Sequence, residues 1–171
     1  MGKLVVIALL VVCLLGGVGI WYTQTRAFWA PVEGAVALAA GGTPIEAAEV
    51  DAIASSSSPL GFRACFRHGL DPDAVGASPR PDPAPTVAPG WFGCFDAEDV
   101  AALIRAGEAR AFTSHENAAY GVDRVVALAR DGRGWAWHEL NACGRRSYDG
   151  SPVGEACPDR ATFEPLADGG A

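Results

Sequence analysis

The chain of 171 residues has a formal net charge of −7, five cysteines and one methionine. An acidic surface repels phosphate groups, so the charge excludes nucleic acid and anionic lipid surfaces as favourable partners. The single methionine argues against a methionine-rich copper relay or an adaptable peptide groove. The residues beyond a membrane segment suffice for one domain with its own core, but not for two.

The first predicted element is a membrane-spanning helix. The stretch Leu4–Tyr22 has no charge and no proline, and a helix over it reaches roughly 28 Å, about the thickness of the hydrocarbon core of a bilayer. We therefore expect a cytoplasmic start at residues 1–3, an uncleaved signal anchor at 4–22 and a juxtamembrane segment at 23–34. Aromatic residues stand where an interfacial belt would lie: Trp21, Tyr22, Phe28 and Trp29.

Two other interpretations of residues 1–25 are open. A secretory signal peptide would be cleaved at a small-x-small site such as Gly17–Gly19, but its apolar core is usually about 7–15 residues long, shorter than the stretch found here. A lipoprotein signal needs small residues before its cysteine, whereas Val11 and Val12 precede Cys13. We expect Cys13 to be a small apolar residue that faces lipid.

Charge and cysteine usage both indicate export of the remaining chain. Lys3 lies before the span, and the positive-inside rule then favours a single-pass protein of the inner membrane with its carboxy-terminal domain in the periplasm. We predict the disulfides Cys65–Cys94 and Cys143–Cys157, because each cysteine has its nearest partner there and each bond closes a loop with proline or glycine. Each would stabilise the fold by roughly 3–4 kcal/mol. The close cysteine spacing typical of zinc sites and redox pairs is missing from the sequence.

The domain itself is expected to span residues 35–166. Its beginning is weakly patterned and predicts two short strands, 35–40 and 44–48. Alternating apolar and polar residues at 62–67 predict a strand with one buried face. Residues 70–90 contain six prolines, which remove backbone donors and stiffen the chain, so we expect an extended surface loop.

A helix at 97–106 has the clearest local signal. Asp96 is a suitable N-cap, Glu98 and Asp99 lie in the first turn, and Gly107 follows the last residue. This helix is expected to pack on the sheet through its apolar stripe.

Three strands and a hairpin are predicted next, at 109–113, 124–129 and 134–140. The Asp131-Gly132 pair is typical of the turn that joins the last two of these strands. The remaining chain is expected to be loop, with a disordered tail at 167–171. The predicted fold is α+β: a transmembrane helix, then one small domain with an antiparallel sheet, one packed helix and disulfides.

Of the loops expected between two strands, the segment 114–121 has the highest density of polar residues. We therefore consider it a speculative binding loop. His115-Glu116 and His138-Glu139 are not zinc motifs of the HExxH type, because alanine stands four residues after each histidine. Ser114 and His115 are adjacent in sequence, so in a strand they would point to opposite faces and could not readily share a proton. The residues of the speculative binding loop are His115, Glu116, Asn117 and Tyr120, with His138 near them on a strand.

The combination of several short stretches is specific. They are Met1–Leu4 with the apolar span, Ser57–Phe66, Ala88–Asp96, Tyr120–Ala127, Trp137–Gly144 and Tyr148–Gly150. On these residues the chain resembles an uncharacterised family of short single-span proteins from alphaproteobacteria of the Rhodobacter type. The resemblance implies a membrane anchor and a domain of unknown function. It implies no activity and no catalytic residues.

The sequence favours a non-enzymatic binding or accessory protein of the cell envelope, with another envelope or membrane protein as partner. We assign no catalytic residue, no metal ligand and no cofactor. An alternative is a protein that handles a metal or cofactor through His115, His138 and reduced cysteines. A hydrolase centred on His115 and Glu116 is the least favoured interpretation.

Overall fold

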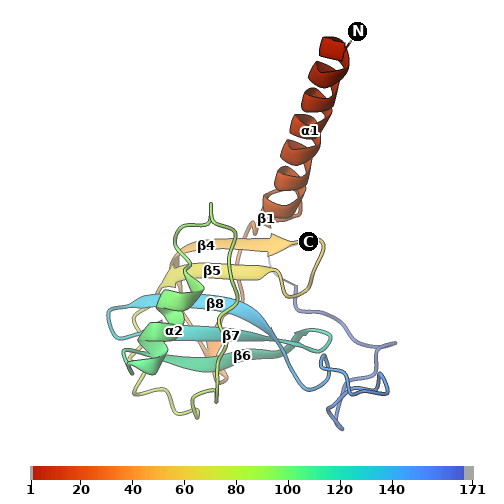
Figure 1. The fold of residues 1–171 in the computed structure, drawn as a ribbon. Coiled ribbons are helices and arrows are strands. Elements are labelled where there is room, and N and C mark those ends of the chain that lie inside the picture. The colour runs from red at the N-terminus through yellow and green to blue at the C-terminus, as the bar shows by residue number, and fades with distance from the viewer. Residues whose placement is uncertain (1, 168–171) are drawn as a thin grey trace.

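In the computed structural model, which describes residues 2–167, a helix projects from a domain built around one antiparallel sheet (Figure 1). The tail predicted to be disordered lies outside the described residues except for Ala167. The fold is α+β, as the sequence predicted. Its elements in chain order are α1 (Gly2–Thr25), β1 (Trp29–Pro31), β2 (Ala39–Ala40), β3 (Thr43–Pro44), β4 (Ala48–Ser55), β5 (Phe62–Arg67), α2 (Ala97–Arg105), β6 (Ala109–Ala119), β7 (Val122–Ala129) and β8 (Arg133–Leu140).

Helix α1 stands away from the rest of the molecule, and none of its side chains is buried (Figure 1). It has 24 residues, which gives a length of about 36 Å. Among residues 2–167 it is the one helix long and apolar enough to cross a membrane. It extends the predicted span at both ends, so the residues expected just before and just after the membrane are helical as well.

The main sheet has six strands in the order β1-β4-β5-β8-β7-β6, and every neighbouring pair is antiparallel. A separate two-stranded hairpin is formed by β2 and β3. The first three strands of this order, β1, β4 and β5, lie nearest to α1, and we call them the anchor half. Strands β8, β7 and β6 form the distal half (Figure 1).

Both faces of the sheet are buried, which corrects the prediction of a strand with one buried face at 62–67. On one face α2 and the loop before it cover Trp135, Trp137 and Val125. On the other face the segment around β2 and β3 covers Phe62, Phe66 and their neighbours. Sequence alternation indicates which residues share a face, but it does not show whether a distant loop covers the other face.

Several predicted strands differ from the observed ones. The strand expected at 35–40 shrinks to β2, and most of the strand expected at 44–48 is not extended, since β3 ends at Pro44 and β4 begins at Ala48. β1 and the rest of β4 were not predicted. The prediction of a polar loop at 114–121 is wrong, because β6 continues to Ala119 and leaves only a tight turn before β7.

The helix and the last hairpin agree with the sequence. Asp96 accepts hydrogen bonds from the amides of Glu98 and Asp99 at 2.8 and 3.1 Å, which satisfies two donors at the start of α2. Gly132 has φ +82°, the left-handed conformation that the turn between β7 and β8 requires.

The loop at 70–90 has no helix or strand, as expected, but it is more than a surface loop. The amide of Arg80 donates to the carbonyl of Ala111 at 2.7 Å, and the amide of Gly41 donates to the carbonyl of Thr113 at 3.1 Å. Both bonds lie on the edge of β6 that faces away from β7. Two loops therefore cover the outer edge of the sheet.

Candidate functional site

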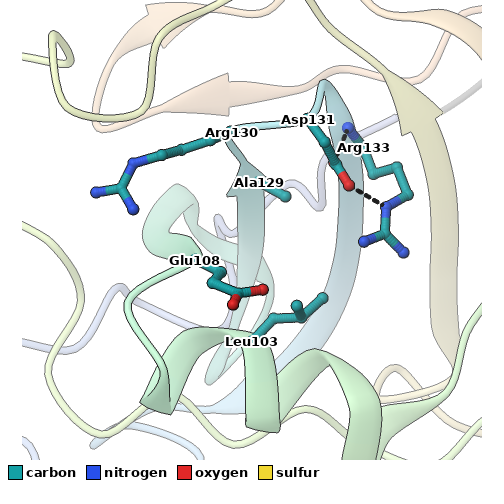
Figure 2. A pocket seen from close by; sticks show the side chains of 6 residues that line it. All are labelled: Leu103, Glu108, Ala129, Arg130, Asp131 and Arg133. Atoms are coloured by element: carbon teal, nitrogen blue, oxygen red, sulfur yellow. Dashed lines mark hydrogen bonds and ion pairs between the residues drawn. The ribbon is translucent and has the colours of Figure 1, made fainter.

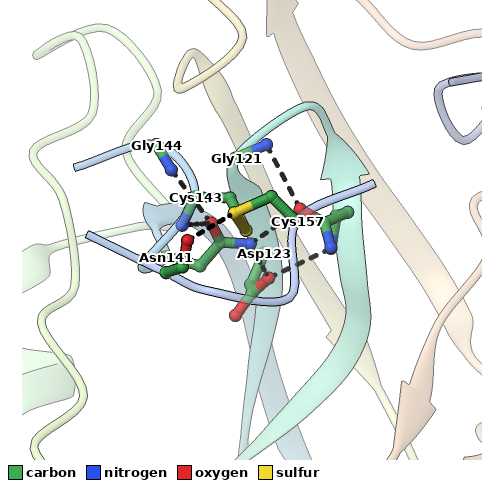
Figure 3. The surroundings of a disulfide bond; sticks show 8 residues. Gly121, Asp123, Asn141, Cys143, Gly144 and Cys157 are labelled. Carbon is green, nitrogen blue, oxygen red and sulfur yellow. Dashed lines mark hydrogen bonds between the residues drawn. A yellow bond between two sulfur atoms is a disulfide. The ribbon is translucent and has the colours of Figure 1, made fainter. Parts of the chain in front are cut away.

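The two disulfides attach loops to the sheet. Cys65 of β5 is bonded to Cys94 in the loop before α2, and Cys143 just after β8 is bonded to Cys157 in the tail. These are the pairs that the sequence analysis expects. Around the second bond, the Asn141 side chain accepts from the amides of Cys143 and Gly144 and donates to Asp123 (Figure 3). The tail is thereby joined to the ends of β7 and β8.

The residues of the speculative binding loop do not form one site. His115 and His138 lie in one row across the sheet, each paired in register with Arg124 between them. Asn117 belongs to a polar cluster that includes Asp123. Tyr120 packs against Phe163, with ring centroids 5.7 Å apart. Glu116 is exposed.

The row around Arg124 is a buried structural arrangement. Arg124 is 1% exposed, and its Nε atom donates to Nε2 of His138 at 3.2 Å. Nδ1 of His138 lies 2.6 Å from the carbonyl oxygen of Pro59. Because Nε2 accepts and Nδ1 donates, the geometry assigns His138 as a neutral ring with its proton on Nδ1. The ring also stacks on Phe62 at 4.8 Å, so packing fixes its orientation.

Ser114 and His115 do contact each other, which corrects the expectation from the sequence. Oγ of Ser114 lies 2.9 Å from Nδ1 of His115, because the register of β6 shifts between Thr113 and His115. Oγ also accepts from the amide of Ala39 at 2.9 Å, and Ser114 is only 8% exposed. A substrate would have to displace β2 to reach this hydroxyl, so the contact fits a structural role.

A second polar cluster, which we call the Arg80 cluster, consists of Arg80, Thr113, Asp123, Glu139 and Asn141. Asp123 and Glu139 are directly opposite each other on β7 and β8, a placement that is destabilising for two like charges. Arg80 reaches in from the loop and bridges them, with Nη1 at 3.1 Å from Asp123 and Nε at 3.1 Å from Glu139. All three side chains are at most 15% exposed.

The remaining carboxylate oxygens of the Arg80 cluster also have donors. Oδ1 of Asp123 accepts from the Asn141 side chain at 2.7 Å and from the amide of Asn117 at 3.0 Å. Oε1 of Glu139 accepts from the Trp137 indole at 2.7 Å and from the amide of Ala84 at 2.8 Å. Each oxygen is therefore occupied, and neither carboxylate is available as a general base without breaking these bonds.

A cavity of about 560 Å³ opens beside the Arg80 cluster. Asp82 and Arg145 line it together with the cluster, and Arg145 is exposed. This volume lies within the range of small-molecule and peptide sites. Sequence reasoning missed the site, because Arg80 is 43 residues before Asp123 and no local pattern links the two.

A smaller cavity of about 220 Å³ lies between α2 and the turn after β7 (Figure 2). Leu103 of α2 and Glu108 line one side, and Ala129, Asp131 and Arg133 line the other. Hydrogen bonds from Arg133 hold the pKa of Asp131 below its usual range. Asp131 and Arg133 pair with each other, and Arg130 pairs with Asp73 outside the hollow. This smaller hollow is therefore a weaker candidate than the cavity beside the Arg80 cluster.

A metal site is not formed by the residues that the alternative interpretation invokes. Within residues 2–167, no three His, Cys, Asp or Glu side chains gather into a group that could hold a metal ion. The four cysteines of the domain are in disulfides, and Cys13 is in α1.

Comparison with protein families gives a match to the domain. The model of a family of unknown function, DUF6446, matches residues 35–158, which is nearly the whole domain beyond α1. Neither a curated protein nor a solved structure matches the chain.

Proposed function

Because the chain belongs to this family of unknown function, we propose a function from its own architecture. It is a single-span protein of the inner membrane, and its disulfide-bonded domain lies in the periplasm. There the domain acts as a non-enzymatic accessory protein that binds another envelope protein. The observation that carries this proposal is an apolar helix with no buried side chain joined to a domain with two disulfides.

The chemistry of the two parts supports this compartment. An exposed helix of this length and apolarity is stable in a bilayer and not in water. Disulfides persist in oxidising compartments such as the bacterial periplasm. Lys3 before the helix supports the orientation that places the domain on the periplasmic side.

The polar side chains favour binding over catalysis, because those that could act chemically are already hydrogen-bonded or buried. The carboxylates of Asp123 and Glu139 have donors on every oxygen, and the Ser114 hydroxyl is covered. The cavity beside the Arg80 cluster is the surface that we expect to bind the partner. Arg145 lines it and has no side-chain partner among the described residues, so it can take a carboxylate or carbonyl oxygen of a polar segment.

The topology is tested by counting thiols and mapping disulfides in protein taken from its native membrane without reductant. We expect both disulfides, and a carboxy-terminal alkaline phosphatase fusion should be active. Four free thiols in the domain would overturn the periplasmic location and revive the metal-handling alternative.

The binding surface is tested by placing a photo-crosslinking amino acid at Ala142, an exposed residue that lines the cavity, in the full chain with Arg145 left in place. The matched control is the same substitution at Ala102, an exposed alanine of α2. We expect one discrete product from position 142 that the control does not give. Equal products from both positions would contradict the assignment of the cavity.

A further inference from the structure

The domain is attached to α1 at two points that are far apart in the sequence. Only residues 26–28 separate the helix from β1. In addition, the indole of Trp91 donates to the carbonyl oxygen of Thr25 at 2.7 Å. This carbonyl is one of the groups at a helix end that have no partner within the helix. Trp91 therefore caps the anchor from the loop before α2.

Trp91 is itself fixed to the domain. Its ring lies edge-on to Phe92, with centroids 6.2 Å apart, and Phe92 is 4% exposed in the core. The guanidinium of Arg26 lies 5.4 Å from the centre of the Trp91 ring. The same loop is also held at Val87, whose carbonyl oxygen accepts from Arg63 at 2.9 Å. In Figure 1 this loop, drawn in green, rises to the level of the lower end of α1.

This attachment sets the distance between the domain and the bilayer. Trp21 and Tyr22 mark the interfacial belt, and Thr25 is less than one helical turn further on, about 5 Å. The headgroup layer on each side of the hydrocarbon core is about 5–8 Å thick. The side chains beside Thr25 must therefore lie within or next to the headgroups.

Exposed apolar side chains lie beside this end of α1 and on the loop that carries Trp91. Phe28, three residues after Thr25, is 47% exposed, and Trp91 is 36% exposed. Val87, four residues before Trp91 on the same loop, is 79% exposed. We call these three residues the membrane patch. From Pro83 to Phe95 the loop contains no charged residue, although the chain as a whole is acidic.

We propose that the membrane patch is a second contact with the bilayer, which holds the domain flat on the lipid surface. The inference rests on the proposed membrane anchor, because α1 sets the height of the patch. The partner is the interfacial layer of the bilayer, since aromatic and aliphatic side chains at this depth exchange water for lipid. Because the patch is uncharged except for Arg26 beside it, the contact does not require anionic lipid.

The test measures the depth of one side chain in the full-length protein. A nitroxide is attached to Val87→Cys in a Cys13→Ala background, and the protein is reconstituted in phosphatidylcholine vesicles. Collision rates are measured with oxygen, which partitions into lipid, and with a water-soluble nickel chelate. The matched control is Val153→Cys, an exposed valine in the tail after β8 whose amide donates to the carbonyl oxygen of Arg145 at 3.1 Å.

We expect the label at 87 to be several-fold less accessible to nickel than the label at 153, and more accessible to oxygen. Equal nickel accessibility at the two positions would overturn the membrane patch. Flotation of the vesicles separates this result from failure of the anchor. Protein that does not float overturns the proposed function, whereas floating protein with an accessible position 87 overturns only the patch.

A second variant tests the role of Trp91. Trp91→Ala removes the bond to Thr25 and the aromatic contact with Arg26. The label at 87 should then gain nickel accessibility several-fold, while the label at 153 stays unchanged. An unchanged label at 87 would contradict the role of Trp91. Disulfide mapping of each variant verifies that the domain is folded.

Discussion

Two arginines on the same face of the sheet are buried in opposite ways, one in the anchor half and one against the distal half. Arg63 of β5 reaches outward and donates to the backbone carbonyls of Leu60, Thr86 and Val87. Arg80 reaches inward from the loop and binds the carboxylates of Asp123 and Glu139. Both arginines attach the loop at 70–90 to the sheet, but only the second one neutralises opposite charges.

The neutral surroundings of Arg63 affect its pKa. Burial lowers the pKa of Arg63 to about 10, because carbonyl dipoles replace only part of the hydration that the cation loses. This value is still well above neutral pH, so Arg63 stays charged. In the anchor half one cation organises neutral backbone, whereas in the distal half the cation also prevents repulsion between two strands. The two halves should therefore respond differently to loss of their arginine.

The largest effect is expected from Arg80→Met. The substitution leaves Asp123 and Glu139 opposite each other without a counter-charge, and breaking a buried ion pair in this way costs about 3–5 kcal/mol. Urea unfolding of the full chain in detergent should measure this loss at pH 7. Adding Asp123→Asn and Glu139→Gln removes the repulsion and should recover part of it. A triple variant no more stable than Arg80→Met would contradict the charge argument.

Loss of a disulfide should come next, and it compares the two halves directly. Cys65–Cys94 closes a separation of 29 residues and Cys143–Cys157 one of 14. Loop-closure entropy then gives about 3.5 kcal/mol for the first bond and about 3 kcal/mol for the second. Paired Cys→Ala variants, measured by thermal unfolding, should rank in this order. A larger loss from the tail disulfide would show that the tail contributes more to the fold than its loop length indicates.

Arg63→Met should cost less than Arg80→Met, about 1.5–3 kcal/mol, the usual value for hydrogen bonds from a charged group. The freed carbonyls of Thr86 and Val87 belong to a loop and can turn toward water. Chemical denaturation checks the size of the loss. Arg67→Met on the same strand is the control, since Arg67 is exposed and should change stability by less than about 0.5 kcal/mol.

The smallest effect concerns the surface attachment of the same loop. Hydrogen bonds from Arg130, with Arg110 nearby, hold the pKa of Asp73 below its usual range. The folded-state pKa is thus lower than the unfolded one. The stabilisation is present above about pH 4 and is lost as pH falls through the folded value. Asp73→Asn should therefore flatten the fall in Tm as the pH drops below about 4, the ordinary pKa of an aspartate. If Tm falls with decreasing pH equally in the variant and the original protein, the ion pairs of Asp73 contribute no measurable stability.

Local signals in the sequence predicted the elements that depend on local physics. Asp96 caps α2, and Asp131-Gly132 turns β7 into β8. The apolar stretch at the amino terminus predicted α1, because helix length and the absence of charge are local properties.

The candidate site could not be predicted, because its parts come together only through tertiary contacts. Asp123 and Glu139 are recognisable as a pair only when the register of β7 and β8 is known. Arg80 comes from a proline-rich loop that resembles a solvated segment in sequence. The burial of Arg63 could not be predicted for the same reason. Arg63 alternates with apolar residues, as a surface residue does, and is nevertheless only 5% exposed because that loop covers it.

The covered edge of β6 has a consequence for the membrane-anchored protein that we propose. Proteins that diffuse in two dimensions meet their copies far more often than they would in solution, and a bare strand edge would join them into growing sheets. Here the amides of Gly41 and Arg80 occupy two outer carbonyls of β6, those of Thr113 and Ala111. The opposite edge, β1, has only three residues and ends in Pro31. Both edges are therefore poor templates for pairing with a second copy.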